Sequence, residues 1–361
     1  MVTNLPEAAK AQWKRVVAAR TPEEKLEELR KFYSMIPKHK GTKNLVKQVR
    51  RQMARLREEV DERRRRKAGV YRSRWSEEKH GVARVAILSE DQFLGENIFR
   101  KLSGRDVEDS LRWSYEPIYG VFSYDSIQFQ LTLLPPYNIS DSLDHRIYTY
   151  IKSSVDYILV SGYNVDDVNK FLSQLSEDGL YIGCGYGEIY IEKTPTGGVR
   201  IVNNPGLRYD EVINLLRSYR IYNAIVKFDG EVSLSDIEDY ILGIRTVKPG
   251  SAILCEGECI IYRICRGRIC GELGPLDNIS AGKEVLDGLG LIRVYTRPHG
   301  GDILDKPVIL KKNSRVIDLA REIHSRLYKN FRYAVIERGG KRIRASKNFR
   351  LEDGDIVTIY A

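Results

Sequence analysis

RVAILSEDQFLGENIFRKLSG, residues 84–104, is the stretch of sequence that decides the fold. Its first five residues form a short apolar run of the kind that makes a buried strand. Residues 97–102 then carry apolar side chains at helical spacing, and Gly104 is placed to end the helix. A strand, a tight loop and a helix in this order form the scaffold of a phosphate-binding loop. Residues 89–96 between them contain one glycine, no lysine and three acidic residues, so the scaffold lacks the usual chemistry.

The length and hydropathy of the chain indicate a folded protein outside the membrane. With 361 residues it has room for two to four domains and a sizeable core. No stretch approaches 18 consecutive apolar residues, and the first ten residues are polar. We therefore expect no transmembrane helix, no signal peptide and no membrane partner, and we predict a cytoplasmic protein.

The charge is distributed unevenly, with two basic ends around an acidic middle. Residues 1–80 contain 23 Lys and Arg against 11 Asp and Glu, a balance of +12. Residues 292–361 contain 16 against 8, a balance of +8, whereas the 211 residues between hold 20 against 30, a balance of −10. Basic terminal modules are the electrostatic footprint of a protein that places its ends on nucleic acid.

Four of the five cysteines fall within residues 255–270, CEGECIIYRICRGRIC. Their spacings of three, five and four intervening residues lack the paired C-x-x-C knuckles typical of zinc sites, so we predict no metal. A disulfide is the second alternative, and small apolar packing residues are the reading that the pattern favours. The segment alternates like a hairpin with its turn near Arg266 and Gly267.

The N-terminal region, residues 1–80, reads as basic helices. Thr21, Pro22 and Glu24 make a helix start with a capping box. A long helix is expected from about residue 43 to 67, with an apolar seam on one face and the cationic run RRRRK at its end. The sequence therefore predicts a helical hairpin with a cationic face.

The remainder of the chain predicts an α/β fold in two parts. Alternating strands and helices from residue 81 to 291 favour a mostly parallel sheet, with a second small α/β unit inserted at about 172–229. Residues 292–361 follow the β-grasp order of two strands, a helix and further strands. The helix of this last unit is expected at 316–327.

Several stretches together resemble the developmentally regulated GTP-binding (DRG) proteins of the Obg-like GTPase group. RYDEVINLLRSYRIYNAIVKF, residues 208–228, is similar to an insertion that these proteins carry in the GTPase domain. LIRVYTRP, residues 291–298, followed by SRLYKNFRYAVI and LEDGDIVTI, is similar to their C-terminal TGS domain, a ubiquitin-like module. The resemblance covers nearly the whole chain and implies a GTPase-like domain, a translation-related role and an archaeal member.

The nucleotide-binding motifs of that family are substituted here. On the frame G-x-x-x-x-G-K-[ST], both glycines, the lysine and the hydroxyl residue are lost. D-x-P-G becomes LLPP, N-K-x-D becomes CEGE, and only a weak fifth motif remains as SAG. The degenerate positions are Ser89, Leu94, Gly95, Glu96, Ser114, Leu133, Pro136, Cys255, Glu256, Glu258, Ser280 and Ala281. From these substitutions we expect no cofactor, with neither GTP nor Mg²⁺ bound, and no catalytic residue.

The resemblance and the basic ends together predict a non-catalytic protein that binds the ribosome or another structured RNA. A-form RNA is recognised mainly by shape and backbone, for which clustered cations suffice. The expected phosphate contacts are Arg50, Arg51, Arg55, Arg63, Arg64, Arg65, Arg66, Lys67, Arg326, Lys329, Arg332, Lys341, Arg342, Arg344 and Lys347. Two alternatives remain: a divergent active GTPase, and a scaffold that binds a translation factor protein.

Overall fold

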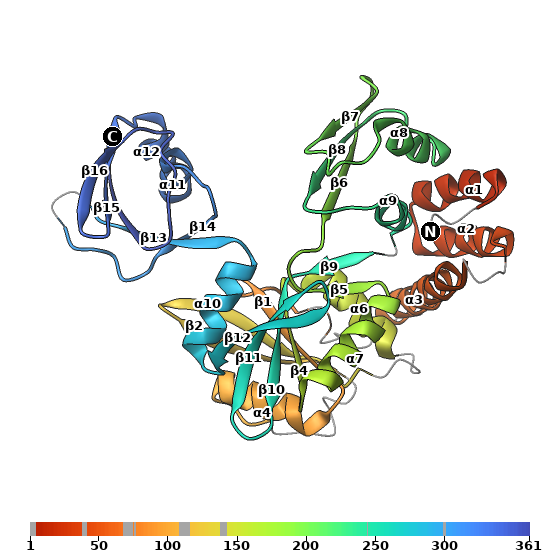
Figure 1. The fold of residues 1–361 in the computed structure, drawn as a ribbon, viewed down its shortest axis with the longest axis horizontal. Coiled ribbons are helices and arrows are strands. Elements are labelled where there is room, and N and C mark those ends of the chain that lie inside the picture. Colours follow the sequence, from red (N-terminus) through yellow and green to blue (C-terminus); the bar gives the residue numbers. More distant parts are fainter. Residues whose placement is uncertain are drawn as a thin grey trace.

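The computed structural model describes residues 5–37, 42–67, 75, 77–107, 116–137, 143–243, 245–298 and 301–361. A central α/β domain carries two arms (Figure 1). The C-terminal unit forms one arm, and the inserted unit together with the N-terminal helices forms the other. Within the described part of the chain, no helix has the length and apolar character needed to cross a membrane.

The central domain is built on a seven-stranded sheet in the order β12-β11-β10-β4-β1-β3-β2. The four inner strands β10, β4, β1 and β3 run parallel, while β2, β11 and β12 pair antiparallel at the two sides. The strands are β1 (Arg84–Ser89), β2 (Ile118–Tyr124), β3 (Ile127–Leu133), β4 (Tyr157–Gly162), β10 (Gly250–Cys255), β11 (Cys259–Cys265) and β12 (Arg268–Pro275).

Helices cover both faces of this sheet, because alternate residues of each inner strand point to opposite sides. In β1, Val85 and Ile87 pack with α4 (Gln92–Ser103) and α10 (Asn278–Gly288). Ala86 and Leu88 pack on the other face with α6 (Leu143–Ser154) and α7 (Val165–Glu177). The predicted α/β class is confirmed, but parallel pairing is limited to the four inner strands, since three of the six strand pairs are antiparallel.

The inserted unit is a separate three-stranded sheet in the order β6-β8-β7. It joins the central domain through the short parallel pair β5 and β9. The expected start at residue 172 is too early, because α7 packs against the central sheet, and the unit extends beyond 229 to include α9. Its elements and connections are β5 (Leu180–Ile182), β6 (Glu188–Lys193), β7 (Val199–Val202), α8 (Tyr209–Ser218), β8 (Ala224–Asp229), α9 (Leu234–Ile241) and β9 (Thr246–Lys248).

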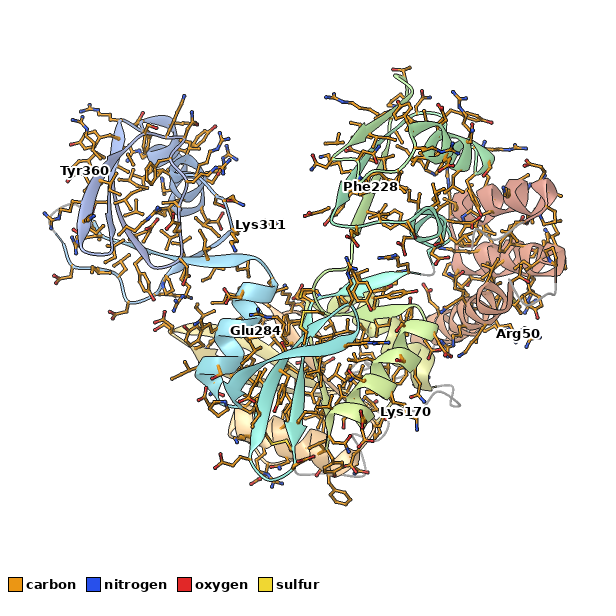
Figure 2. The ribbon with its side chains drawn as sticks, in the orientation of Figure 1. Arg50, Lys170, Phe228, Glu284, Lys311 and Tyr360 are labelled. Atoms are coloured by element: carbon orange, nitrogen blue, oxygen red, sulfur yellow. A yellow bond between two sulfur atoms is a disulfide. The ribbon has the colours of Figure 1, made fainter. Side chains whose placement is uncertain are left out.

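The N-terminal helices share one hydrophobic core with the inserted unit. They are α1 (Glu7–Ala18), α2 (Pro22–Met35) and α3 (Lys43–Lys67). The predicted capping box at Thr21 is present. Phe32 of α2 is fully buried in the same cluster as Phe228 of β8, and the Trp13 indole donates to the Ile241 carbonyl at 3.2 Å. Figure 2 places Phe228 within the inserted unit and Arg50 at the outer side of the helices.

Asp239, on α9, makes the stability of the protein depend on pH. Burial, together with the neighbouring Glu238 carboxylate, raises its pKa to about 6, against about 3.9 in an unfolded chain. The folded state therefore binds more protons than the unfolded state between about pH 4 and 6, and the free energy of unfolding falls as the pH rises through that window.

Asp239→Asn is expected to raise the free energy of unfolding at pH 7 by about 3 kcal/mol, because it removes the cost of burying the charge. The gain should vanish near pH 4. Urea unfolding at both pH values measures it, with Glu192→Gln, an exposed side chain on β6, as the control that changes little. A gain that is equal at the two pH values would contradict the assignment.

The C-terminal unit is a five-stranded sheet in the order β14-β13-β17-β15-β16. Its elements are β13 (Leu291–Thr296), β14 (Val308–Lys311), α11 (Val316–Ile323), α12 (Ser325–Lys329), β15 (Tyr333–Arg338), β16 (Lys341–Ala345) and β17 (Asp355–Tyr360). The single helix expected over 316–327 is divided, because His324 has extended backbone and its ring nitrogen accepts from the Arg326 amide.

The cysteines differ from the expected packing role. Cys255 is bonded to Cys259 and Cys265 to Cys270, and Cys184 is free and exposed. The predicted hairpin is present, with Arg266 and Gly267 at positive φ in its turn. Cys255 and Cys259 flank the β10–β11 turn, and Cys265 and Cys270 flank the β11–β12 turn. Each hairpin therefore brings its own pair of sulfur atoms together.

Candidate functional site

The carboxyl edge of the central sheet gathers most of the predicted motif positions. Because the four inner strands are parallel, their ends at Ser89, Leu133, Gly162 and Cys255 meet at one edge. Ligands of open α/β sheets bind at this edge. The start of α10 joins it, because the Leu276 amide donates to the Cys259 carbonyl at 2.8 Å.

The loop after β1 is shorter than the predicted span of residues 89–96. Helix α4 begins at Gln92, because the Asp91 carboxylate caps it by accepting from the Leu94 amide at 2.8 Å. The Asp91 amide in turn donates to the Ser89 hydroxyl at 3.1 Å. An aspartate at the N-cap satisfies a free amide of the first turn, and this signal in the sequence was missed.

Leu94, Gly95 and Glu96 consequently lie inside α4. Leu94 and Gly95 are buried against the sheet, and the Gly95 amide donates to the Asp91 carbonyl at 3.2 Å. In a P-loop these positions supply glycine amides, a lysine and a magnesium-bound hydroxyl to the phosphates. The side chains present here do not supply that set. Ser114 lies outside the described residues.

Carboxylates and a tyrosine dominate the electrostatics beside the capped helix. Burial raises the pKa of Glu90, and the Lys170 ammonium opposes that rise. Partial desolvation and the Asp91 carboxylate, to which it hydrogen-bonds, raise the pKa of the exposed Tyr163 hydroxyl. The cation that acts on Glu90 is therefore Lys170 on α7, not a residue of the loop.

The other motif positions are occupied by packing or turn residues. Leu133 is fully buried at the end of β3, and Pro136 is half-buried after it. Glu256 and Glu258 are exposed in the turn that the Cys255–Cys259 disulfide closes.

At the start of α10, the Ser280 amide donates to Asp277 at 2.7 Å, and Ala281 is buried. The structure thus brings the described motif positions to the carboxyl edge of the central sheet. That they are the degenerate remains of a nucleotide site stays a prediction.

The seven predicted cations of the C-terminal unit are all exposed. Arg342 pairs with Glu337 at 2.9 Å, and the Arg344 guanidinium lies 4.2 Å from the ring centre of Tyr333. For the other five, the described residues include no ion-pair partner: Arg326, Lys329, Arg332, Lys341 and Lys347. This group, named here the free C-terminal cations, is available to an anionic partner.

The N-terminal cations have more structural roles than the sequence indicated. Lys47 and Arg51 both pair with Asp178, whose side chain is fully buried beyond α7, with Lys47 at 3.0 Å. Arg50 is exposed and donates to the Tyr33 hydroxyl at 2.6 Å. Arg51 thus helps to hold α3 on the central domain, and its contact with phosphate stays a prediction.

Arg55 and residues 63–67 belong to α3, but their side chains lie outside the described ones. Asp178 was not predicted, since 127 residues separate it from Arg51 and no local pattern marks the pair.

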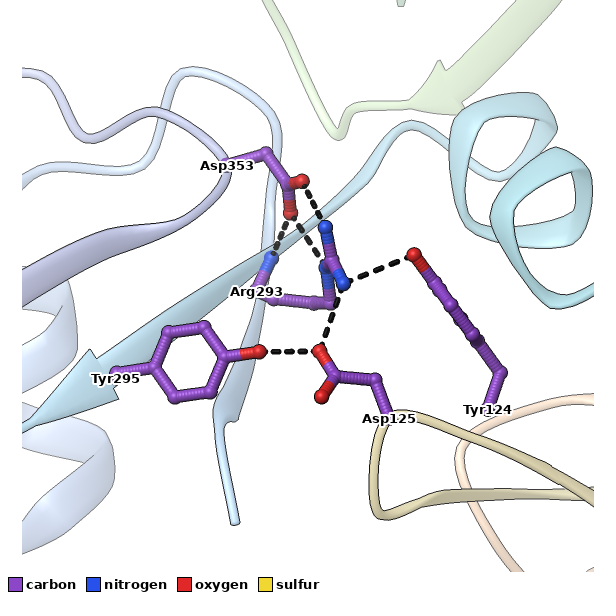
Figure 3. Close-up of polar contacts among 5 residues, drawn as sticks. All are labelled: Tyr124, Asp125, Arg293, Tyr295 and Asp353. Atoms are coloured by element: carbon purple, nitrogen blue, oxygen red, sulfur yellow. Dashed lines mark hydrogen bonds and ion pairs between the residues drawn. The ribbon is translucent and has the colours of Figure 1, made fainter. Parts of the chain in front are cut away.

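A hydrogen-bonded hub joins the C-terminal unit to the central domain (Figure 3). Arg293 of β13 donates to the Tyr124 hydroxyl at 3.0 Å, to Asp125 at 2.7 Å and to Asp353 at 2.6 Å. Tyr295 also donates to Asp125, and burial with that carboxylate raises its pKa to about 12. The hub sits at the β2–β3 turn, directly before the amino end of β3, so it is remote from the carboxyl edge.

Arg293→Gln is expected to lower the free energy of unfolding by about 2 kcal/mol, because charge-assisted hydrogen bonds across the hub are lost. Thermal unfolding measures the change. Arg342→Gln removes a comparable charge from a side chain that is 74% exposed, and should cost about 0.5 kcal/mol or less. Equal effects of the two variants would show that the hub contributes nothing beyond a surface ion pair.

Known proteins resemble this chain in its C-terminal unit and over most of its length. Residues 292–361 match the model of the TGS domain. An uncharacterized GTP-binding protein of Methanocaldococcus jannaschii is 23% identical over 93% of this chain and 92% of its own length. Developmentally-regulated G-protein 2 of Arabidopsis thaliana is 25% identical over 93% and 90%. Ribosome-interacting GTPase 1 of Saccharomyces cerevisiae is 26% identical over 77% and 82%.

A solved YchF GTPase of Schizosaccharomyces pombe aligns with 80% of this chain and all of its own, at 12% identity and a TM-score of 0.37. That score is too low to support an inference. The sequence relatives and the TGS match confirm the predicted resemblance. The chain is an α/β protein with a C-terminal TGS domain, and over nearly its whole length it is similar to proteins named as GTP-binding or developmentally regulated G-proteins.

The expectation of no cofactor, with neither GTP nor Mg²⁺, is wrong as stated. The relatives that align with 93% of the chain are named as GTP-binding proteins or G-proteins. That expectation rested on substituted motif side chains alone. A nucleotide is also held by backbone amides and helix termini, so substituted side chains do not by themselves remove a ligand.

Proposed function

We propose that the protein binds the ribosome, or a structured RNA of the translation apparatus, through its basic ends. The proposal extends to a central domain that does not itself hydrolyse GTP. A yeast relative carries interaction with the ribosome in its name. The observation that supports the proposal most directly is the group of free C-terminal cations.

The chemistry of these cations suits a polyanion. All five are exposed on the β-grasp unit, whose overall balance is +8. Lysine and arginine side chains that contact phosphates release counterions, which gives affinity without reading sequence. The exposed Arg50 adds a cation on the N-terminal helices. We therefore assign RNA phosphates as the first contact.

Co-sedimentation with purified ribosomes tests this function. The protein should pellet with intact ribosomes, and treatment of the ribosomes with nuclease should release it. Release by nuclease separates RNA contact from the alternative of a scaffold for a translation factor protein. Retention on nuclease-treated particles would favour that scaffold and overturn the RNA assignment.

We propose that GTP is not hydrolysed because of the residues at the carboxyl edge of the central sheet. Phosphoryl transfer requires cations on the transferring group and a positioned metal. Asp91, Glu90 and Glu96 are acidic residues at this place, and Gly95 stands where the P-loop has its lysine. A nucleotide bound here would therefore lack the charges that stabilise the transition state.

We expect no release of phosphate from GTP above the buffer rate, with or without ribosomes. Single-turnover assays with labelled GTP and Mg²⁺ measure this, and a separate filter-binding assay reports whether GTP is held. Ribosome-stimulated hydrolysis would establish the divergent GTPase, the second alternative. The two assays keep binding of the nucleotide distinct from its hydrolysis.

A further inference from the structure

Cys184, the free cysteine, lies against a disulfide. Its sulfur is 3.3 Å from the sulfur of Cys265, which is itself bonded to Cys270. Cys184 belongs to the connection between β5 and the inserted unit, whereas the disulfide spans the β11–β12 hairpin. Three sulfur atoms from distant parts of the sequence thus meet at one place, and Cys184 is exposed to solvent there.

The backbone holds Cys184 in this position. Its amide donates to the Ile264 carbonyl at 2.8 Å, and its carbonyl accepts from the Arg266 amide at 2.8 Å. The preceding residue must be small, because a Cβ on Gly183 would lie 2.5 Å from the Ile264 carbonyl oxygen, and its φ is +109°. The close approach of the two sulfur atoms is therefore built into the fold, and does not depend on a mobile side chain alone.

We propose that residues 184, 265 and 270 form a thiol–disulfide exchange site. The Cys184 thiolate attacks the sulfur of Cys265, a bond forms between these two sulfurs, and the Cys265–Cys270 bond breaks. Cys270 leaves as a thiolate and takes up the proton that Cys184 released. One disulfide and one thiol are present before and after, so the step needs no oxidant or reductant.

The exchange changes what the covalent bond holds together. Before it, the bond closes a short ring within the hairpin, between residues five positions apart. After it, the bond joins positions 81 apart and encloses the inserted unit, from β6 to α9. The exposed thiol then becomes Cys270. The attachment of one arm to the central domain would thus be covalently fixed or released.

In the unfolded chain, the Cys265–Cys270 bond is favoured over the Cys184–Cys265 bond. Loop-closure probability falls roughly as the 3/2 power of loop length, so the short ring is preferred on the order of 60-fold over the long one. A substantial population of the Cys184–Cys265 bond is therefore a signature of the folded protein.

Disulfide mapping at equilibrium tests the proposal. The full chain is incubated at mildly alkaline pH, quenched with acid, alkylated and digested without reduction, in native buffer and in urea. We expect at least a tenfold larger fraction of Cys184–Cys265 in the native sample, with alkylated Cys270 appearing in step. An equal or smaller native fraction would overturn the proposal. The Cys255–Cys259 pair, at the opposite end of β11, serves as the internal reference.

Two variants isolate the chemistry. Cys184→Ser should leave Cys270 fully protected from alkylation in native buffer, since no attacking thiol remains. Cys270→Ser leaves Cys184 and Cys265 as thiols, and oxidised glutathione should join them into one intramolecular bond with release of two glutathione molecules. Mixed disulfides with glutathione alone, in a variant whose circular dichroism is unchanged, would show that the two sulfurs do not meet.

Discussion

Replacing Lys329, Arg332 and Lys341 with glutamine should weaken ribosome binding about 100-fold to 500-fold at about 0.1 M salt. Each phosphate contact contributes a salt exponent of about 0.7 to 0.9, which corresponds to roughly five- to eightfold in affinity at that concentration. All three side chains are exposed, and the described residues offer them no ion pair. The loss should appear in co-sedimentation or fluorescence anisotropy, and the salt exponent should fall by about 2 to 3.

A matched control removes the same charge elsewhere. Lys193, Arg200 and Arg217 are exposed on the inserted unit, within the acidic middle of the chain. Their replacement by glutamine should change the affinity about threefold or less. If both triple variants lost the same affinity, net charge alone would explain the binding, and the C-terminal unit would not be the contact surface.

Phe32→Ala is expected to lower the free energy of unfolding by about 3–5 kcal/mol, the usual cost of removing a fully buried aromatic ring. The ring centre of Phe32 lies 5.0 Å from that of Trp13, and both belong to the core shared with the inserted unit. Chemical unfolding measures the loss. Phe93→Ala, on a side chain that is 77% exposed, should stay within about 0.5 kcal/mol.

The shared core leads to a second prediction, which concerns hydrogen exchange. Hydrogen exchange in Phe32→Ala should accelerate in α8 and β8 of the inserted unit as well as in the N-terminal helices. Protection that falls in the helices alone would contradict a common core. It would then mean that the N-terminal helices unfold independently of the unit on which they pack.

Much of this fold could be predicted, because its elements follow local rules. The apolar run of β1, the capping box at Thr21 and the hairpin turn at Arg266 and Gly267 all use signals within a few residues. The start of α4 was misplaced by five residues, because the motif frame was given more weight than Asp91 as an N-cap.

The contacts between units could not be predicted in the same way. Arg293 meets Asp125 across 168 residues, and Arg51 meets Asp178 across 127. A single sequence carries no local sign of such a pair, since either residue reads as a solvated charge. For the same reason Arg51 was assigned to RNA, although the fold uses it to anchor α3.

The two arms attach to the central domain away from the carboxyl edge of its sheet. The C-terminal hub lies at the β2–β3 turn, and the inserted unit returns through β9 directly before β10 begins. Both attachments are thus at amino ends of the parallel strands, whereas the candidate nucleotide positions lie at the carboxyl ends. We infer that the basic C-terminal surface can engage RNA without involving the edge where a nucleotide would bind.

Ribosome affinity measured across a salt series tests the central claim most directly. Five free C-terminal cations, each with an exponent of about 0.7 to 0.9, give a logarithmic slope of about −4. The affinity should therefore fall about 1000-fold between about 50 and about 300 mM salt. An affinity that stays constant over this range would contradict electrostatic binding of RNA through the basic ends.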